Sequence, residues 1–123
     1  MARSATADAR LGKNGVMVQR AGFVEMREYD LVIGGIGKFL DAYREHGYPI
    51  QRLHLGEPIG WYTTEIGALN QVVHLWRYES FDDRAERRNR LFEDPGWLAY
   101  VAMTTPLLVA QRSRIMYEPS LGV

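Results

Sequence analysis

The sequence predicts an α+β fold of the ferredoxin-like type, in which a four-stranded antiparallel sheet carries helices on one face. Strand-like and helix-like runs follow one another in the order βαββαβ. Two of the strand-like runs are separated by a short polar connection, which favours an antiparallel hairpin. The length of 123 residues suits one domain with its own hydrophobic core, and we place that domain at residues 22–123.

The first half of the domain contains a strand, a helix and a second strand. The run FVEMREY at residues 23–29 alternates apolar and polar side chains with the period of a strand. Apolar residues at helical spacing predict a helix over residues 35–46, which Gly47 and Pro49 are expected to end. Residues 59–66 are rich in aromatic and β-branched side chains and predict the second strand.

The second half contains the third strand, two helical segments and the last strand. The third strand is predicted within LNQVVHLWRYES, residues 69–80. Ser80 is expected to cap a helix, with Asp83 completing an approximate capping box. That helix is expected to turn Phe81, Ala85, Leu91 and Phe92 inward and to expose Arg84, Arg87, Arg88 and Arg90. Asp94 and Pro95 begin another helical segment, Pro106 interrupts it, and residues 109–117 form the last strand.

The third strand divides its side chains between the two faces of the sheet. Val73 and Leu75 point one way, whereas His74, Trp76 and Tyr78 point the other way. We expect the aromatic set to lie on the face that the helices leave uncovered. A face with so much apolar area is unfavourable in water, so we expect it to meet the sheet of a twofold-related copy.

Residues 1–21 are interpreted as a flexible N-terminal arm. They lack the apolar core of a secretory signal, and Asp8 argues against a transit peptide. No stretch approaches the roughly 20 apolar residues of a membrane helix. The 15 basic and 15 acidic residues balance, which argues against nucleic acid as a partner, and the absence of cysteine excludes disulfides and thiolate chemistry. We therefore expect a cytoplasmic protein without a membrane or nucleic-acid partner.

Three segments resemble the NIPSNAP family: residues 47–56, residues 64–80 and Asp94-Pro-Gly-Trp97. Glu25-Met-Arg-Glu-Tyr29 is similar to that family's opening E-L-R-x-Y run, and the resemblance covers about residues 23–118. It implies the dimeric α/β barrel, in which two ferredoxin-like protomers pack sheet to sheet. It implies no settled activity, and carrying over the chemistry of other proteins with this barrel is analogy alone.

The expected barrel interior collects the candidate site residues. His74 is the favoured acid–base, with Glu25 or Glu65 as the carboxylate that orients it. The expected binding residues for a small apolar or aromatic molecule are Arg27, Tyr29, Trp61, Asn70 and Trp76. The molecule is expected between sheet and helices or inside the barrel, where a cofactor-independent enzyme could act on it with monooxygenase- or isomerase-like acid–base chemistry. In the alternative interpretation these groups form an internal network that only specifies the dimer, in a non-catalytic interaction or scaffold protein.

Other site types are disfavoured by the sequence. His46, His54 and His74 share no metal-ligand spacing, so no metal site is expected. Residues 34–37 lack the lysine and the hydroxyl residue of a P-loop, and no G-x-S-x-G nucleophile motif is present. We expect no cofactor.

Overall fold

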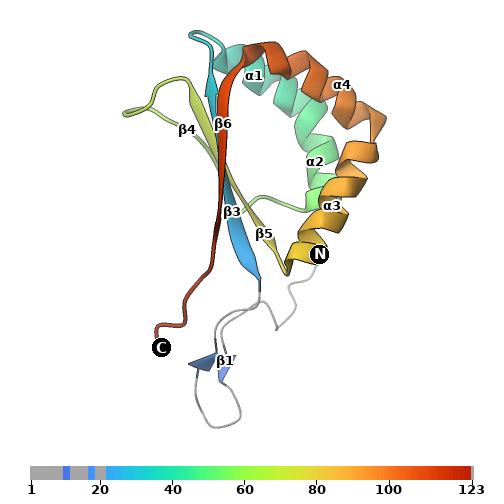
Figure 1. The fold of residues 1–123 in the computed structure, drawn as a ribbon. Helices are drawn as coiled ribbons and strands as arrows, with labels where there is room; N and C mark the ends of the chain where they lie inside the picture. The colour runs from blue at the N-terminus through green and yellow to red at the C-terminus, as the bar shows by residue number, and fades with distance from the viewer. Residues whose placement is uncertain (1–9, 12–16, 19–21, 123) are drawn as a thin grey trace.

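The computed structural model describes residues 10–11, 17–18 and 22–122. Four strands form one antiparallel sheet in the order β4 (Gly60–Thr63), β5 (Gln71–Tyr78), β3 (Phe23–Leu31) and β6 (Leu108–Met116) (Figure 1). Two short strands, β1 (Arg10–Leu11) and β2 (Met17–Val18), pair with each other. The predicted α+β protomer is confirmed. The interpretation of residues 1–21 lies outside the described residues, apart from β1 and β2.

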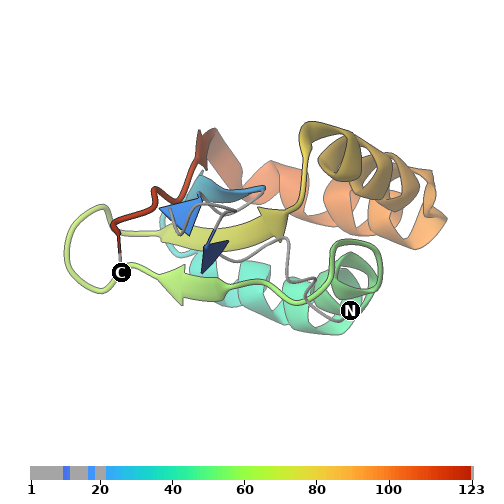
Figure 2. The ribbon, with the colours of Figure 1, turned by 90° about the horizontal axis from the view of Figure 1, so that it is seen from below.

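The helices lie together on one face of the sheet, in two neighbouring groups (Figures 1 and 2). The first group is α1 (Ile36–Ala42), the π-helical segment η2 (Tyr43–Gly47) and α2 (Tyr48–Leu55). The second group is α3 (Phe81–Glu93) and α4 (Pro95–Thr104), followed by the 3₁₀ turn η3 (Thr105–Leu107). Among the described residues, no helix combines the length and the apolar character needed to cross a membrane.

The predicted end of the first helix at Gly47 was wrong. Gly47 keeps a helical backbone, with φ of −93° and ψ of −55°, and the chain continues into α2. A Cβ atom at this position would lie 2.8 Å from the ring of Tyr100 and 2.9 Å from that of Tyr43. Glycine therefore serves close packing rather than termination. Pro49 lies in the first turn of α2, where its missing N–H costs little.

The caps of α3 and α4 agree with the prediction. The Asp83 N–H donates to Ser80 Oγ at 3.0 Å, and the Glu79 N–H donates to Asp83 Oδ2 at 2.9 Å. Asp94 accepts from the Gly96 N–H at 2.9 Å, with Pro95 in the first turn. Pro106 lies in η3, where α4 ends.

The side chains of α3 differ from the expectation at several positions. Leu91 is buried, but Phe81 and Phe92 are more than two-fifths exposed. Arg84 and Arg87 do not point into solvent: Arg84 reaches Glu25, and Arg87 donates to the Leu55 carbonyl at 3.0 Å.

The predicted assignment of the sheet faces was wrong. His74, Trp76 and Tyr78 are at most 2% exposed and belong to the core between sheet and helices. The uncovered face carries the opposite set of side chains, which includes Val73 and Leu75. Alternation separates the two sets without saying which one the helices cover. The helices cover the bulkier aromatic set, because burying it removes more apolar area from water.

Candidate functional site

The sheet register places the predicted site residues next to one another. On β3, Arg27 lies opposite His74 of β5 and opposite Ser113 of β6. On β4, Trp61 lies opposite His74. The row Trp61, His74, Arg27 and Ser113 therefore crosses the whole sheet on the face that the helices cover.

His74 is enclosed by aromatic rings. The Trp61 ring stacks on the imidazole with centroids 5.4 Å apart and planes 9° apart. The Tyr29 ring meets it edge-on, at 5.0 Å and 85°. Trp76 Nε1–H donates to His74 Nδ1 at 2.6 Å. Among the described residues, Trp76 is the only side chain that hydrogen-bonds to His74.

These contacts fix the protonation state of His74. Burial, and next the positive charge of Arg27, lower the pKa of His74 to about 3. The imidazole is therefore neutral at physiological pH. Since an indole N–H can only donate, Nδ1 must carry the lone pair, and the single proton is on Nε2. His74 thus presents an N–H donor and lacks the free lone pair of a general base.

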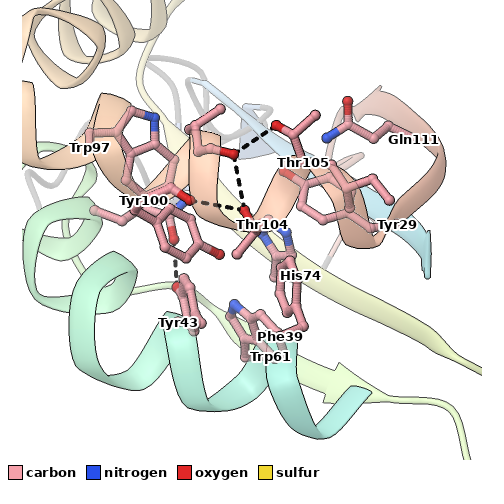
Figure 3. Close-up of a pocket in the computed structure, with 13 residues that line it drawn as sticks. Tyr29, Phe39, Tyr43, Trp61, His74, Trp97, Tyr100, Thr104, Thr105 and Gln111 are labelled. Atoms are coloured by element: carbon pink, nitrogen blue, oxygen red, sulfur yellow. Dashed lines mark hydrogen bonds between the residues drawn. The ribbon is translucent and has the colours of Figure 1, made fainter. Parts of the chain in front are cut away.

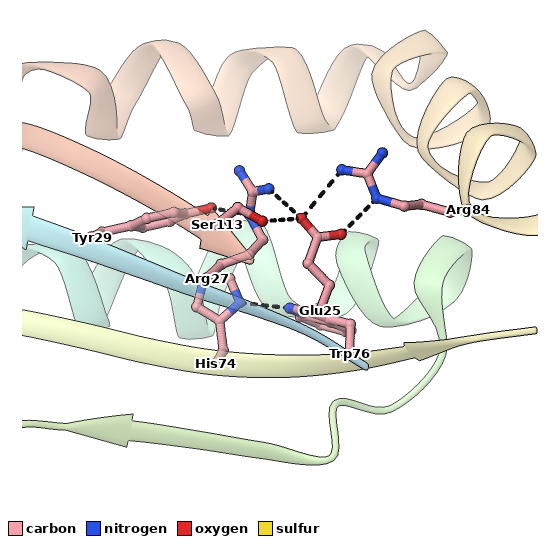
Figure 4. A network of polar contacts seen from close by, with 7 residues as sticks. All are labelled: Glu25, Arg27, Tyr29, His74, Trp76, Arg84 and Ser113. Atoms are coloured by element: carbon pink, nitrogen blue, oxygen red, sulfur yellow. Dashed lines mark hydrogen bonds and ion pairs between the residues drawn. The ribbon is translucent and has the colours of Figure 1, made fainter. Parts of the chain in front are cut away.

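A separate ionic network surrounds Glu25 (Figure 4). Glu25 is fully buried and accepts from Arg84 Nε at 2.6 Å, from Arg27 Nη1 at 2.8 Å and from Ser113 Oγ at 2.5 Å. Burial alone would raise the pKa of Glu25, but the hydrogen bonds from Arg84, Ser113 and Arg27 outweigh it and lower the pKa to about 2. Arg27 Nε also donates to the Tyr29 hydroxyl at 3.1 Å. The carboxylate is ionised, and both of its oxygens accept hydrogen bonds.

A cavity of about 60 Å³ lies beside His74, between the sheet and both groups of helices (Figure 3). That space holds several water molecules or a few heavy atoms of a ligand. Aromatic and small apolar side chains form most of its wall, and a few polar groups converge on it. The lining residues include Tyr29, Phe39, Tyr43, Trp61, His74 and Tyr100.

The polar groups of the helical wall are neutral. Tyr43 donates from its hydroxyl to Gln51 Oε1 at 2.5 Å. Burial raises the pKa values of both Tyr43 and Tyr100, so both keep their phenolic protons. Thr104 donates to the Tyr100 carbonyl at 3.2 Å. A neutral molecule suits this part of the cavity better than a charged one.

The structure brings together some of the predicted site residues. His74, Trp61 and Tyr29 line the cavity, and Trp76 orients His74 from the neighbouring position on the same face. Glu25 and Arg27 bind each other instead of His74 and do not line the cavity. The prediction that Glu25 or Glu65 orients His74 was therefore wrong.

Glu65 and Asn70 lie outside the site. Glu65 is exposed in the connection between β4 and β5. Asn70 ends that connection with a left-handed backbone, φ 58°, and its carbonyl accepts from the Leu31 N–H at 2.7 Å. Asparagine adopts this conformation more readily than most residues, so Asn70 is a turn residue. The predicted strand over residues 59–66 is shorter than expected because the chain leaves the sheet after Thr63.

The cavity residues supplied by the helices were not predicted as site residues. Phe39, Tyr43 and Tyr100 have the spacing of ordinary core positions, which gives no sign that their rings border a space. Gln51 and Thr104 are buried polar residues within helices. Polar residues on an otherwise apolar helix face are the one signal that could have identified them.

No metal centre forms among the described residues, where no group of three or more histidine, aspartate and glutamate side chains is placed to hold an ion. His54 Nε2 lies 3.0 Å from Asp94 Oδ2 and links the end of α2 to the cap of α4. His46 lies on the surface beside Glu45.

Comparisons with known proteins agree on one family. The family model described as NIPSNAP matches residues 24–120. A NipSnap homologue from Dictyostelium discoideum is 36% identical over 97 residues, which are 79% of this chain and 43% of that protein. NipSnap from Drosophila melanogaster is 33% identical over 109 residues, covering 88% of this chain and 36% of that protein. The chain thus spans less than half the length of these relatives.

Solved structures give the same result. A NIPSNAP family protein of unknown function from Agrobacterium tumefaciens is 40% identical, with a TM-score of 0.78 over 82% of this chain and 91% of that one. A NIPSNAP-like domain protein from Burkholderia xenovorans is 44% identical, with a TM-score of 0.78 over 81% of this chain and 87% of that one. An antibiotic biosynthesis monooxygenase candidate from Nitrosomonas europaea, with 12% identity and a TM-score of 0.60, shares the fold alone.

Proposed function

Because the chain belongs to the NIPSNAP family, and its solved relative from Agrobacterium tumefaciens is of unknown function, we propose its role from the site: it binds a small apolar or aromatic molecule in the cavity beside His74. The observation that carries this proposal is a polar donor on a mostly aromatic wall. His74 Nε2–H has no hydrogen-bond partner among the described residues, and the ring lines the cavity. A ligand with a carbonyl, ether or hydroxyl oxygen would satisfy this donor.

The geometry supports binding in preference to acid–base catalysis. A general base needs a lone pair within reach of the substrate and a pKa near the working pH. The Nδ1 lone pair of His74 is occupied by Trp76, and its pKa is about 3. The donor Nε2–H remains suited to polarising a carbonyl or stabilising an oxyanion. In an enzymatic reaction His74 would therefore act as a hydrogen-bond donor that polarises the substrate.

The Glu25 network supports a structural role for the other half of the predicted site. Every polar contact of the carboxylate is made by this chain's own residues, and it lies apart from the cavity lining. Such a network fixes strand register and ties α3 to the sheet. The two interpretations of the sequence therefore apply to different residues. Glu25, Arg27 and Arg84 have the structural role, and His74, Trp61 and Tyr29 have the binding role.

The ligand is tested by filling the cavity. Val101→Phe adds bulk at a half-buried lining position of α4. We expect a small molecule to co-purify with the wild-type protein and to be lost from this variant, as measured by native mass spectrometry of protein isolated from its own cells. Ala102→Phe, which adds a ring at an exposed neighbouring position, is the matched control. Equal retention by both variants would place the ligand elsewhere.

We further propose that the uncovered sheet face joins two copies of the chain. It carries an apolar patch of Val24, Met26, Val73, Leu75 and Met116, and charged side chains lie around and beside that patch: Glu28, Asp30, Arg77, Arg112 and Arg114. No helix of the described chain covers this face, and the β4–β5 connection extends on the same side (Figure 1). In that connection Ile66 is 92% exposed. An apolar face of this kind suits a twofold partner.

Leu75→Glu is expected to convert the dimer into a monomer. Leu75 lies on the central strand β5 between Met26 and Gly60, so a carboxylate there would be buried without a partner on dimerisation. Light scattering coupled to size exclusion measures the mass. Leu53→Glu, at an exposed apolar position of α2, should leave the mass unchanged. A wild-type protein that is already monomeric at micromolar concentration would refute the proposal.

A further inference from the structure

A second hollow lies on the outer side of the cavity wall. It is a surface groove of about 280 Å³ between the first helical group and the edge strand β4. Its lining is mostly apolar and contains one charged residue, Arg44; the residues are Leu40, Tyr43, Arg44, Tyr48, Pro58 and Trp61. Tyr43 and Trp61 also line the cavity beside His74. The two side chains are therefore the wall that separates the hollows.

The two halves of this wall are held in different ways. Tyr43 is 7% exposed, and its hydroxyl is held by Gln51 at 2.5 Å. Trp61 stacks on Tyr43 with centroids 4.8 Å apart, on a strand of four residues that has only β5 as a neighbour. An edge strand has a neighbouring strand on one side only, so fewer backbone hydrogen bonds hold it in place than hold an inner strand. Figure 3 shows Tyr43 and Trp61 on the same side of the cavity, away from Thr105 and Gln111.

We propose that the groove and the cavity form one binding site, and that its ligand is an elongated, flat organic acid that enters past Trp61. The acceptor end of the ligand meets His74, its apolar body lies against Tyr43 and Trp61, and its anionic end meets Arg44. This inference rests on the proposed binding function and adds the ligand class. The cavity alone is far smaller than the 300–1,000 Å³ typical of ligand sites, whereas the two hollows together reach the lower end of that range.

The charge distribution supports an anionic end at the outer groove. Arg44 is 68% exposed, and its ion pair with Asp41 is long, 3.4 Å, with Asp41 itself 82% exposed. Such a pair contributes little, so a ligand carboxylate can replace Asp41. The inner cavity offers the opposite environment, because its polar groups are neutral and its histidine is held uncharged. The acid group therefore belongs at the outer end.

The test uses two fluorescent probes of nearly the same shape. 1-Anilinonaphthalene-8-sulfonate carries an anion on a flat aromatic body, and N-phenyl-1-naphthylamine lacks the anion. We expect the wild-type protein to bind one sulfonate probe per chain. Arg44→Gln should lower the affinity for the sulfonate probe about fivefold and leave the affinity for the neutral probe unchanged. Arg44→Lys should retain most of the wild-type affinity for the sulfonate probe. Lys38→Gln removes a charge from α1 outside the groove and is the matched control.

A second variant tests the groove itself. Leu40→Trp places a large ring in the groove and should abolish binding of both probes, while circular dichroism and the melting temperature confirm the fold. Probe binding that is indifferent to Arg44→Gln and to Leu40→Trp overturns the inference. If the cavity variant Val101→Phe still displaces a co-purified molecule in that case, the proposed function stands and only the extended site fails. Loss of both effects would refute the two proposals together.

Discussion

Glu25→Gln is expected to lower the free energy of unfolding by about 3 kcal/mol at pH 7. The substitution keeps the shape of the side chain but removes the negative charge that Arg27 and Arg84 share. Breaking a buried ion pair leaves the partner charge uncompensated, which typically costs about 3–5 kcal/mol. The lower end applies here because the side chains of Arg27 and Arg84 stay 17% and 29% exposed and can reach some water.

Denaturant unfolding of Glu25→Gln and Glu86→Gln side by side measures this effect. Glu86 lies on α3, with its side chain 71% exposed and 2.6 Å from Arg90. Its replacement should cost less than about 1 kcal/mol, as is usual for surface ion pairs. A Glu25 variant no less stable than the Glu86 variant would contradict the structural role of the network.

The second large effect is an acid sensitivity that His74 gives to the fold. Its pKa is about 3 in the folded state against 6.5 in the unfolded chain. Between these values the unfolded state binds a proton that the folded state does not, so stability is complete above about pH 6.5 and falls as the pH is lowered towards 3. At pH 5 the expected loss is about 2 kcal/mol, from roughly 1.4 kcal/mol per pH unit.

His74→Asn separates this contribution from the rest of the protein. The asparagine oxygen can still accept from Trp76 but cannot take up a proton. We expect the difference in unfolding free energy between wild type and variant to shrink by about 2 kcal/mol between pH 7.5 and pH 5. His46→Asn, at an exposed histidine, is the matched control. Glu25 does not interfere in this window, because its stabilisation is lost only as the pH falls from about 4.5 towards 2. Parallel curves for wild type and His74→Asn would mean that His74 is not held neutral.

Much of the fold was predictable because local signals determine it. Ser80, Asp83 and Asp94 fix the starts of α3 and α4 through short-range hydrogen bonds, and alternation identifies β3 and β5. The end of the first helix was not predictable in the same way. Gly47 and Pro49 carry the local signal of a stop, but Gly47 is there because the rings of Tyr43 and Tyr100 leave no room for a side chain. That is a tertiary constraint.

The site was predicted in part, and for a physical reason. Sheet parity groups Glu25, Arg27, Tyr29, Trp61, His74 and Trp76 on one face, as the structure also has them. Parity cannot tell which face the helices cover, nor which neighbours a buried carboxylate selects. The pairing of Glu25 with Arg84 joins residues 59 positions apart, so it depends on how α3 packs on the sheet. The cavity depends on how side chains from the sheet and from both groups of helices leave a space unfilled, which no local pattern encodes.

The two halves of the helix-covered face have different properties. Around Glu25 the polar groups are paired and the charges balance, so that region stabilises the fold. Around His74 the chain holds a neutral donor among aromatic rings next to a cavity. Natural cores leave few buried donors unpaired, and among the described residues the indole N–H groups of Trp61 and Trp97, which also line the cavity, are two that remain.

A crystal structure of the protein purified from its own cells tests the binding proposal most directly. We predict electron density for a flat molecule in the cavity, with an acceptor atom about 2.7–3.2 Å from His74 Nε2, and with Trp76 still bonded to Nδ1. A cavity that contains only water, or a bound molecule that donates to His74 rather than accepting from it, would contradict the account.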